Sequence, residues 1–323
     1  MIEVRKYNPE DKELWNGFIS TAKNATFLFN RNFMDYHKDR FVDYSLLCFK
    51  KGKLVGVLAA NIVGNELYSH QGLTYGGFVV QSKTKFEEYI LIIEYVLKYL
   101  TTHKIEYLYL KELPEIYTSS PSGEFEYIRF LLDAEIIKVD ISSTIKMDSC
   151  IAISSNRMEG YKRGLKFGLK IIEVKGLDSF WNEILIPNLR EKYNVSPVHG
   201  LNEMKLLKKC FPENIRQFNV YDKGELVAGT TVFETNNVAH SQYISGNSDN
   251  NKLGSLDFLH YYLIKEVFKN KSFFDFGIST ENEGRSINKG LLFWKEGFGA
   301  RATTYKTYKI ETKNHANLSQ VFI

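Results

Sequence analysis

Four titratable side chains stand in or just after two apolar segments in the second half of the chain. They are His240 in AHSQYIS, Asp275 and Glu281 in FFDFGISTE, and Lys295 further on. A neutral imidazole can accept a proton near pH 7, a carboxylate can hold an ammonium group, and a lysine can stabilise an oxyanion or a phosphate. These residue types predict proton-transfer chemistry. The alternatives are a satisfied strand histidine, an aspartate bonded to a neighbouring loop and a surface lysine.

The composition is that of a globular protein. The chain has 323 residues, 44% hydrophobic and 25% charged, so at about 150 residues per domain we expect two domains. The net charge of +4 does not require a nucleic-acid partner, and it is compatible with anionic small molecules. Cys48, Cys150 and Cys210 lack metal-ligand spacing, so we expect no metal and a reducing compartment. The charged start and the lack of an apolar run of about 18 residues indicate a cytoplasmic protein without a membrane partner.

The elements that would position these side chains occur twice. KGKLVGVLAANI (51–62) and KGELVAGTTVFE (223–234) stand 172 residues apart, and each is followed by a polar turn, a strand, a helical pattern and another strand. The helices are expected at 86–100 and around 256–267, and the last strands at 105–110 and 273–278. In this match His70 of the first copy corresponds to His240 of the second. The order predicts a duplicated domain; the alternative is two unrelated α/β segments with ordinary hairpins.

Each copy is expected to form a mixed sheet with one parallel strand–helix–strand step, so the fold class is α/β with α+β mixed sheets. A helix that begins at such a step presents free N–H groups suited to a phosphate. We place the boundary in the polar stretch near 145–155, which gives an acceptor-side domain at 1–150 and a donor-side domain at 151–323. Basic residues crowd the start of the second domain, as a wall for an anionic substrate or as a solvated helix face: Arg157, Lys162, Arg163, Lys166 and Lys170.

One block carries a resemblance. NKGLLFWKEGFGAR (288–301) resembles the last helix and strand of GCN5-related N-acetyltransferases (GNAT), with Asn288, Gly297 and Phe298 as the matching residues. Its form is closer to the Fem branch, which has two such domains in tandem, and RMEGYKRGLKFGLKI (157–171) is similar to a basic segment of that branch. The resemblance implies two tandem GNAT-like domains of Fem type.

Further blocks resemble a Fem-like group of bacterial N-acyltransferases found with surface-polysaccharide enzymes. These blocks are FNRNFMDYHKDRFVDYSLL, SHQGLTYGG, PVHGLNEM, HSQYISG and FDFGISTENEG. The resemblance implies transfer of an acetyl or short hydroxyacyl group, such as 3-hydroxybutanoyl, from acyl-CoA. The acceptor would be the amino group of a dTDP-linked 3-amino-3,6-dideoxyhexose destined for lipopolysaccharide, O-antigen or capsule. The enzyme would be a monomer or a dimer.

The resemblance also implies donor-binding residues in the second domain. The expected set is Gln242, Tyr243, Gly246, Leu253, Gly254, Ser255 and Asn288. Three positions depart from the family. The phosphate loop SGNSDNNKLGSLDFL has Asn251 where Gln or Arg is usual and Leu256 where a second Gly or Ala is usual. Phe293 stands where many members have a tyrosine acid. A thiolate leaving group can depart without that acid because its pKa is low.

The acceptor side is expected to use residues of the first domain together with Arg163. The predicted set is Tyr36, His37, Arg40, His70, Tyr75, Tyr117 and Arg163. Arginine can hold a diphosphate in a fork, and an aromatic ring can stack on a thymine. The sugar ammonium must lose a proton before it attacks, which is the role we predict for His240, with Asp275 or Glu281 as alternatives.

Two other functions stay open at this point. A Fem-type aminoacyltransferase would take its donor from aminoacyl-tRNA, but it would favour an extended basic surface. A non-catalytic binding module would fit the altered glycine loop and Phe293, but it would not need the polar strand ends.

Overall fold

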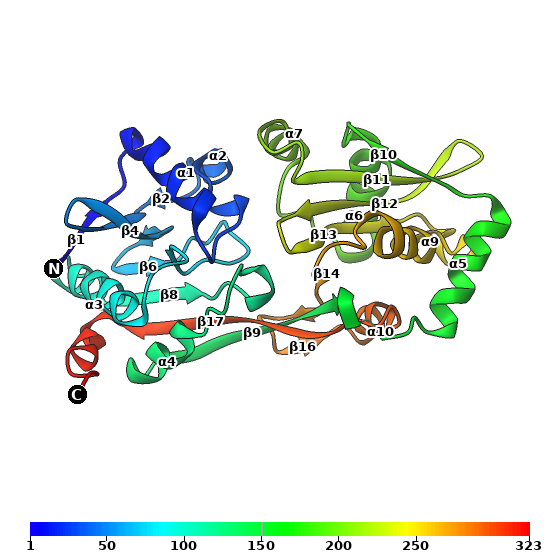
Figure 1. Cartoon of the computed structure of the whole chain (residues 1–323). Helices are drawn as coiled ribbons and strands as arrows, with labels where there is room; N and C mark the ends of the chain where they lie inside the picture. Colours follow the sequence, from blue (N-terminus) through cyan, green and yellow to red (C-terminus); the bar gives the residue numbers. More distant parts are fainter. Residues whose placement is uncertain (150) are drawn as a thin grey trace. The chain divides into compact units, whose positions relative to one another are not determined.

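The computed structural model describes residues 1–149 and 151–323, and the chain folds into two compact units. Unit 1 contains 1–140 and 304–323, so it holds both termini, and unit 2 contains 141–303 (Figure 1). The division differs from a simple cut at 150. It falls inside strand β9 (Glu135–Lys146), whose second half pairs with a strand of unit 2. The last strand, β17 (Arg301–Glu311), brings the C-terminal segment to unit 1 because Thr307–Glu311 pair with β8.

Unit 1 has a sheet of order β1-β3-β4-β7 and a second set of paired strands, β17-β8-β6-β5-β2. Its strands are β1 (Ile2–Lys6), β2 (Val42–Asp43), β3 (Leu46–Lys50), β4 (Lys53–Leu58), β5 (Asn61–Val63), β6 (Glu66–Tyr68), β7 (Phe78–Val80) and β8 (Tyr107–Lys111). Its helices are α1 (Lys12–Thr21), α2 (Arg31–Met34), α3 (Phe86–Thr102) and α4 (Glu124–Leu131), with 3-10 turns at Pro9–Asp11, Phe27–Phe29, Asp35–His37, Glu115–Tyr117 and Thr312–Leu318. The apolar face of α3 lies in the core of this unit, as its periodicity predicts.

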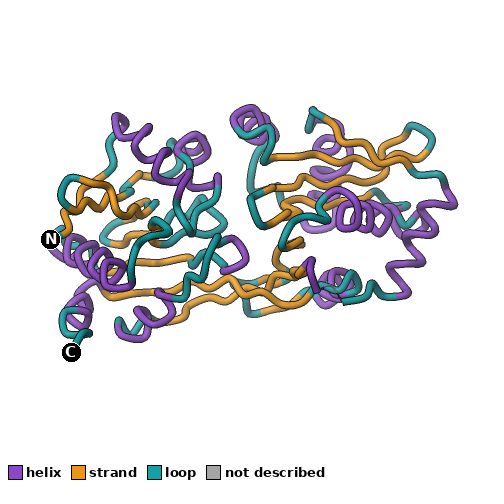
Figure 2. The backbone as a smooth tube through the Cα atoms, in the orientation of Figure 1, coloured by secondary structure: helices purple, strands orange, loops and turns teal. Residues whose placement is uncertain are grey.

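Unit 2 has the strand order β10-β11-β12-β13-β14-β9, and Figure 2 shows its first four strands side by side. The strands are β10 (Lys170–Val174), β11 (Ile215–Asp222), β12 (Glu225–Glu234), β13 (Val238–Gly246), β14 (Phe273–Ile278), β15 (Thr280–Glu281) and β16 (Ser286–Ile287). The helices are α5 (Ser155–Phe167), α6 (Ile186–Tyr193), α7 (Leu201–Cys210), α8 (Asn250–Leu253), α9 (Ser255–Tyr262) and α10 (Lys289–Glu296), with a 3-10 turn at Met147–Ser149 and π-helical turns at Phe180–Leu185 and Leu263–Val267. Helix α9 lies against β12 and β13.

The two KG dipeptides form equivalent hairpin turns. Lys51 and Gly52 have φ of 50° and 73°, and Lys223 and Gly224 have φ of 50° and 95°. Two consecutive left-handed residues are what a two-residue hairpin loop requires, and glycine adopts that conformation at low cost. The turns join β3 to β4 and β11 to β12. The internal repeat predicted from the sequence is therefore present in the backbone.

The strand registers correct one detail of the predicted match. At the 172-residue offset, Gly56↔Val80 in unit 1 corresponds to Ala228↔Gly246 in unit 2. At the other end, Asn61↔Tyr68 corresponds to Phe233↔His240. Tyr68, and not His70, therefore occupies the position of His240. Pairing His70 with His240 by residue type was misleading, because unit 1 has the long loop 69–77 where unit 2 has only residues 241–243.

Candidate active site

The candidate site lies where the parallel strands β13 and β14 part. Their pairing runs through Val238↔Phe273 and Ala239↔Phe274 and ends at His240↔Asp275. Beyond this point β13 continues beside β12 to Gly246, and β14 departs from regular geometry. Parallel strands that separate beyond their last pair leave backbone and side-chain groups facing a common gap, so this end of the step is where the chemistry can take place.

His240 and Asp275 form a hydrogen-bonded dyad at that last pair. His240 Nδ1 lies 2.7 Å from Asp275 Oδ2, and the His240 side chain keeps 12% of its surface exposed whereas Asp275 is completely buried. A carboxylate has no proton to give, so Nδ1 carries the hydrogen and Nε2 presents a lone pair. No hydrogen bond from a described residue occupies His240 Nε2. The imidazole is thus held in the tautomer of a general base.

Two hydroxyl groups anchor the aspartate from the other side. Ser142 Oγ and Thr144 Oγ1 donate to Asp275 Oδ1 at 2.5 and 2.9 Å. Burial alone would raise the pKa of Asp275, but the hydrogen bonds from His240 and from the two hydroxyls outweigh it and hold that pKa below its ordinary value. Asp275 is therefore ionised at neutral pH. Ser142 and Thr144 were not among the residues predicted from the sequence.

Lys295 is buried, and its hydrogen bonds go to backbone carbonyls and not to His240 or Asp275. Its side chain is 2% exposed, and its Nζ donates to the carbonyl oxygens of Gly277 and Ile278 at 2.8 and 2.7 Å. Burial lowers the pKa of Lys295 to about 8, while Asp275 acts in the opposite direction. The structure thus gives the ammonium a backbone partner where an oxyanion or phosphate contact was predicted.

Glu281 and Asn288 meet in the hairpin formed by β15 and β16. Glu281 is exposed and accepts a hydrogen bond from Asn288 Nδ2 at 3.1 Å. Asn288 also caps α10, because its Oδ1 accepts from the backbone N–H of Leu291 at 3.0 Å. Asn288 therefore fixes the start of the helix that carries Lys295.

The predicted donor loop is packed against its own unit. Gly254 has φ of 70°, and a side chain there would collide with the carbonyl oxygen of Gly160 in α5. Asn250 Oδ1 accepts hydrogen bonds from Ser255 Oγ at 2.9 Å and from Leu256 N at 3.0 Å. Asn250 thus already occupies one backbone N–H at the start of α9, and α5 packs against this turn.

The other predicted donor residues lie around this loop. Leu253 belongs to the core, and Gly246 accepts a hydrogen bond from Asn188 Nδ2. Tyr243 packs edge-on against Trp181 with ring centroids 4.8 Å apart, and its hydroxyl lies 2.6 Å from His199 Nδ1. Gln242 is half-buried on β13. Of this predicted set, Gln242, Tyr243 and Gly246 lie on β13, the strand that passes the dyad.

The predicted acceptor residues of unit 1 form two clusters. In the first, His37 stacks on His70 with centroids 4.9 Å apart, Tyr36 packs on His37, and Arg40 lies over the Tyr36 ring at 5.5 Å. Burial lowers the pKa of His70 to about 3, so this imidazole is neutral at physiological pH. Of these four side chains, only that of Arg40 is exposed.

The second cluster joins Tyr75 and Tyr117, whose ring centroids lie 4.8 Å apart. Tyr75 shares a hydrogen bond with Thr26 Oγ1, and Tyr117 shares one with the hydroxyl of Tyr305. Both rings are almost completely buried, since 3% and 6% of their surfaces are exposed. Packing within unit 1 accounts for their burial.

Arg163 is half-buried on α5 in unit 2, and another basic residue of the same helix, Arg157, has an acidic partner. Arg157 Nη1 donates to Asp257 Oδ1 at 2.8 Å, and the same oxygen accepts from Trp294 Nε1. Burial raises the pKa of Asp257 against these opposing hydrogen bonds. The network ties α5, α9 and α10 together, so one member of the predicted basic wall has a structural partner.

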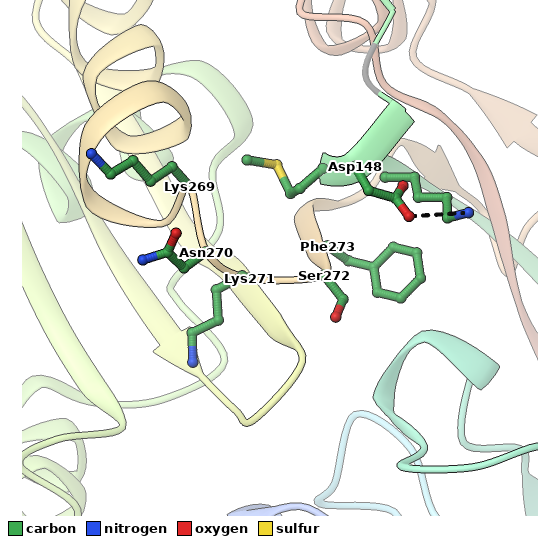
Figure 3. Close-up of a pocket in the computed structure, with 8 residues that line it drawn as sticks. Asp148, Lys269, Asn270, Lys271, Ser272 and Phe273 are labelled. Carbon is green, nitrogen blue, oxygen red and sulfur yellow. Dashed lines mark ion pairs between the residues drawn. The ribbon is translucent and has the colours of Figure 1, made fainter.

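Elsewhere in unit 2, a cavity of about 500 Å³ opens at the beginning of β14 (Figure 3). Its lining is largely polar, but the charges are compensated: Lys146 lies 3.6 Å from Asp148, and Lys271 lies 2.8 Å from Glu234. Neither His240 nor Asp275 lines it. Among the residues that the structure describes, no group of three or more histidine, cysteine, aspartate or glutamate side chains could hold a metal, and no helix is long and apolar enough to cross a membrane.

No protein-family model and no curated protein matches the chain. Solved structures do. FemX superimposes with a TM-score of 0.67 at 11% identity, covering 98% of this chain and 99% of that one. L-PGS from Bacillus licheniformis gives 0.61 at 14% identity, covering 97% and 94%. A tandem GNAT protein from the clavulanic acid biosynthesis pathway gives 0.52 at 11% identity, covering 97% and 99%. The duplicated mixed sheets and these likenesses together establish that the chain has the Fem-like, tandem GNAT fold.

Proposed function

We propose that the protein transfers an acyl group from an activated donor to a primary amine, with His240 as the general base. The observation that carries this proposal is the dyad, in which a fully buried, ionised Asp275 orients the imidazole of His240. A fold likeness at this level of identity says nothing of the reaction by itself. The proposal therefore rests on the site.

The reaction needs one proton acceptor and one leaving group. The amine nitrogen attacks the acyl carbon, a C–N bond forms, and the bond from that carbon to the donor sulfur or oxygen breaks. The proton of the attacking amine passes to Nε2 of His240, and the negative charge of Asp275 stabilises the imidazolium that results. A thiolate can leave without protonation, which suits a chain that has Phe293 at the position of a tyrosine acid.

For the finer assignment we propose an acyl-CoA donor and the amino group of a dTDP-linked 3-amino-3,6-dideoxyhexose as acceptor. The support is the sequence resemblance of the blocks 29–47, 69–77, 197–204, 240–246 and 274–284. In this assignment the donor residues of β13 and the 246–255 loop, and the acceptor residues including Arg40 and Arg163, remain proposed contacts.

A second candidate is aminoacyl transfer, in which the donor is an aminoacyl ester. One observation favours it: Gly254 is pressed against Gly160, and Asn250 already caps the start of α9. A donor without a pyrophosphate at that point would not need the loop to open. The general base and the amine acceptor would be the same in both reactions.

A thiol-release assay separates the candidates. Purified protein is combined with acetyl-CoA or 3-hydroxybutanoyl-CoA and a panel of nucleotide-linked amino sugars, and in parallel with aminoacyl-tRNA and the same amines. Amine-dependent thiol release that is lost in His240→Asn, but kept in the exposed-histidine control His103→Asn, supports acyl-CoA chemistry. Transfer only from aminoacyl-tRNA supports the second candidate. Amide formation that His240→Asn leaves unchanged would exclude the dyad as the base.

A further inference from the structure

Strand β14 contains a bulge directly after Asp275. Asp275 pairs with Thr144 and Ile278 pairs with Ser142, so β14 advances three residues while β9 advances two. Gly277, inside the bulge, has φ of 76°, a conformation that glycine adopts at low cost. A bulge of this kind bends a strand and re-aims its side chains, and it is frequent beside active sites.

The bulge explains how one ammonium group can serve two consecutive carbonyls. In a regular strand successive carbonyl groups point to opposite edges, so the oxygens of neighbouring residues cannot meet at one atom. Here the carbonyl oxygens of Gly277 and Ile278 both accept from Lys295 Nζ, at 2.8 and 2.7 Å. The irregular backbone therefore allows one buried ammonium group to bind both carbonyls.

The bulge lies close to the proposed base. A Cβ atom added at Gly277 would lie 3.3 Å from His240 Cε1 and 3.8 Å from His240 Nε2. A side chain at this position would therefore crowd the edge of the imidazole that carries Nε2, so the place of the bulge backbone decides how much room the ring has. Asp275 fixes the opposite edge through Nδ1.

We propose that Lys295 is a positioning residue: its ammonium group clamps the Gly277–Ile278 backbone, which holds the His240 ring in its reactive orientation against Asp275. The proposal rests on the proposed function of His240. Lys295 itself does not contact the reacting atoms in this assignment. Its effect passes through the backbone of β14 to the imidazole.

The test compares Lys295→Met with Lys289→Met, an exposed lysine at the start of the same helix. Lys295→Met removes the ammonium but keeps an unbranched side chain. A small misplacement of a catalytic group costs up to about 10²-fold in rate, so we expect kcat to fall roughly 10- to 100-fold with less than about a threefold change in acceptor KM. Lys289→Met should match the unmodified enzyme. A Lys295→Met enzyme with unchanged kcat would overturn the proposal.

Two further measurements keep the test decisive. In Lys295→Ala, methylammonium ions should restore acylation of the added acceptor at least about fivefold, whereas equal concentrations of sodium chloride should not. The acceptor amide itself is measured, because methylamine is also a primary amine and could release thiol. No rescue counts against a clamp by the ammonium group. By nitrogen NMR, the His240 ring should keep its Nδ1–H bond in Lys289→Met and lose it or exchange conformers in Lys295→Met. An unchanged His240 spectrum would overturn the proposal. Because NMR does not depend on turnover, it separates this failure from a failure of the proposed reaction.

Discussion

The two parallel steps of the molecule have the same register and different chemistry. In unit 2 the last parallel pair is His240↔Asp275, and in unit 1 the corresponding pair is Tyr68↔Tyr109. The tyrosine rings stack with centroids 4.7 Å apart at an angle of 8°, and both hydroxyls donate to Glu66. A phenol hydrogen-bonded to a carboxylate is a poor proton acceptor; the pKa of Tyr68 is raised to about 12 by that bond. The proposed base, His240, therefore has a tyrosine in its place at the step of unit 1.

The two steps also differ beyond their last pair. In unit 1 the loop 69–77 bridges the strands, because Ser69 N donates to Tyr109 O and Lys111 N donates to Ser69 Oγ. Lys111 Nζ then donates to the carbonyls of Gln71 and Leu73, and burial lowers the pKa of Lys111 to about 8. In unit 2 β13 continues as one strand to Gly246. Each step has a lysine whose ammonium group donates to two backbone carbonyls. Lys111 is half-buried and binds the loop of unit 1, whereas Lys295 is buried and binds the bulge of β14.

The largest effect on kcat should come from position 240, where unit 2 has a histidine and the matching position of unit 1 has Tyr68. His240→Asn removes the proton acceptor, so kcat should fall roughly 10²- to 10⁴-fold, with acceptor KM nearly unchanged. Tyr68→Phe, at the matching position in unit 1, should leave kcat within about twofold. Steady-state kinetics on both variants checks this. A comparable loss in Tyr68→Phe would show that the two steps are not functionally distinct.

Asp275→Asn should give the next largest loss, because the amide can hold the wrong tautomer of His240. We expect kcat to fall about 10²-fold or more. The native pKa of Asp275 lies below its ordinary value, so the unfolded chain binds this proton more readily than the folded protein. The stability from the carboxylate is present above the ordinary aspartate pKa of about 3.9 and is lost as pH falls through the native value. Denaturant unfolding should show a penalty for Asp275→Asn at pH 7 that shrinks in acid; a penalty independent of pH would contradict an ionised Asp275.

The sequence could predict the repeated scaffold but not the complete site. The KG turns, helix α3 and the strand at 273–278 follow from local residue types and periodicity, which is why these expectations agree with the structure. Ser142 and Asp275 are 133 positions apart, and only the antiparallel pairing of β9 with β14 brings them together. The register that aligns Tyr68 with His240 likewise depends on long-range pairing. The bulge that lets Lys295 reach two carbonyls has no local signal beyond a glycine.

Gly277→Ala should lower kcat less than His240→Asn or Asp275→Asn. Comparison with Gly52→Ala separates its effect on His240 from backbone strain. Gly277 and Gly52 have nearly the same φ, 76° and 73°, but a Cβ atom at Gly52 meets nothing within 4 Å. Both substitutions should destabilise the fold by about 1–2 kcal/mol, the usual cost of a left-handed alanine. Only Gly277→Ala should press on His240 and lower kcat, by about tenfold. Equal kcat values in the two variants would show that a side chain at position 277 does not disturb His240.

The smallest effect should come from the hydroxyls that anchor Asp275. Ser142→Ala removes one donor to Oδ1 and leaves Thr144 in place, so the carboxylate keeps a hydrogen bond on each oxygen. A hydrogen bond to a charged group contributes about 1.5–3 kcal/mol, and that loss should appear mainly as lower stability at pH 7. We expect kcat to fall less than about fivefold, because Nδ1 of His240 is bound by the other oxygen, Oδ2. The double variant Ser142→Ala/Thr144→Val should lose more activity than the two single losses combined, since Oδ1 would then have no hydroxyl donor. Additive losses in a double-mutant cycle would mean that the hydroxyls stabilise the sheet without orienting the dyad.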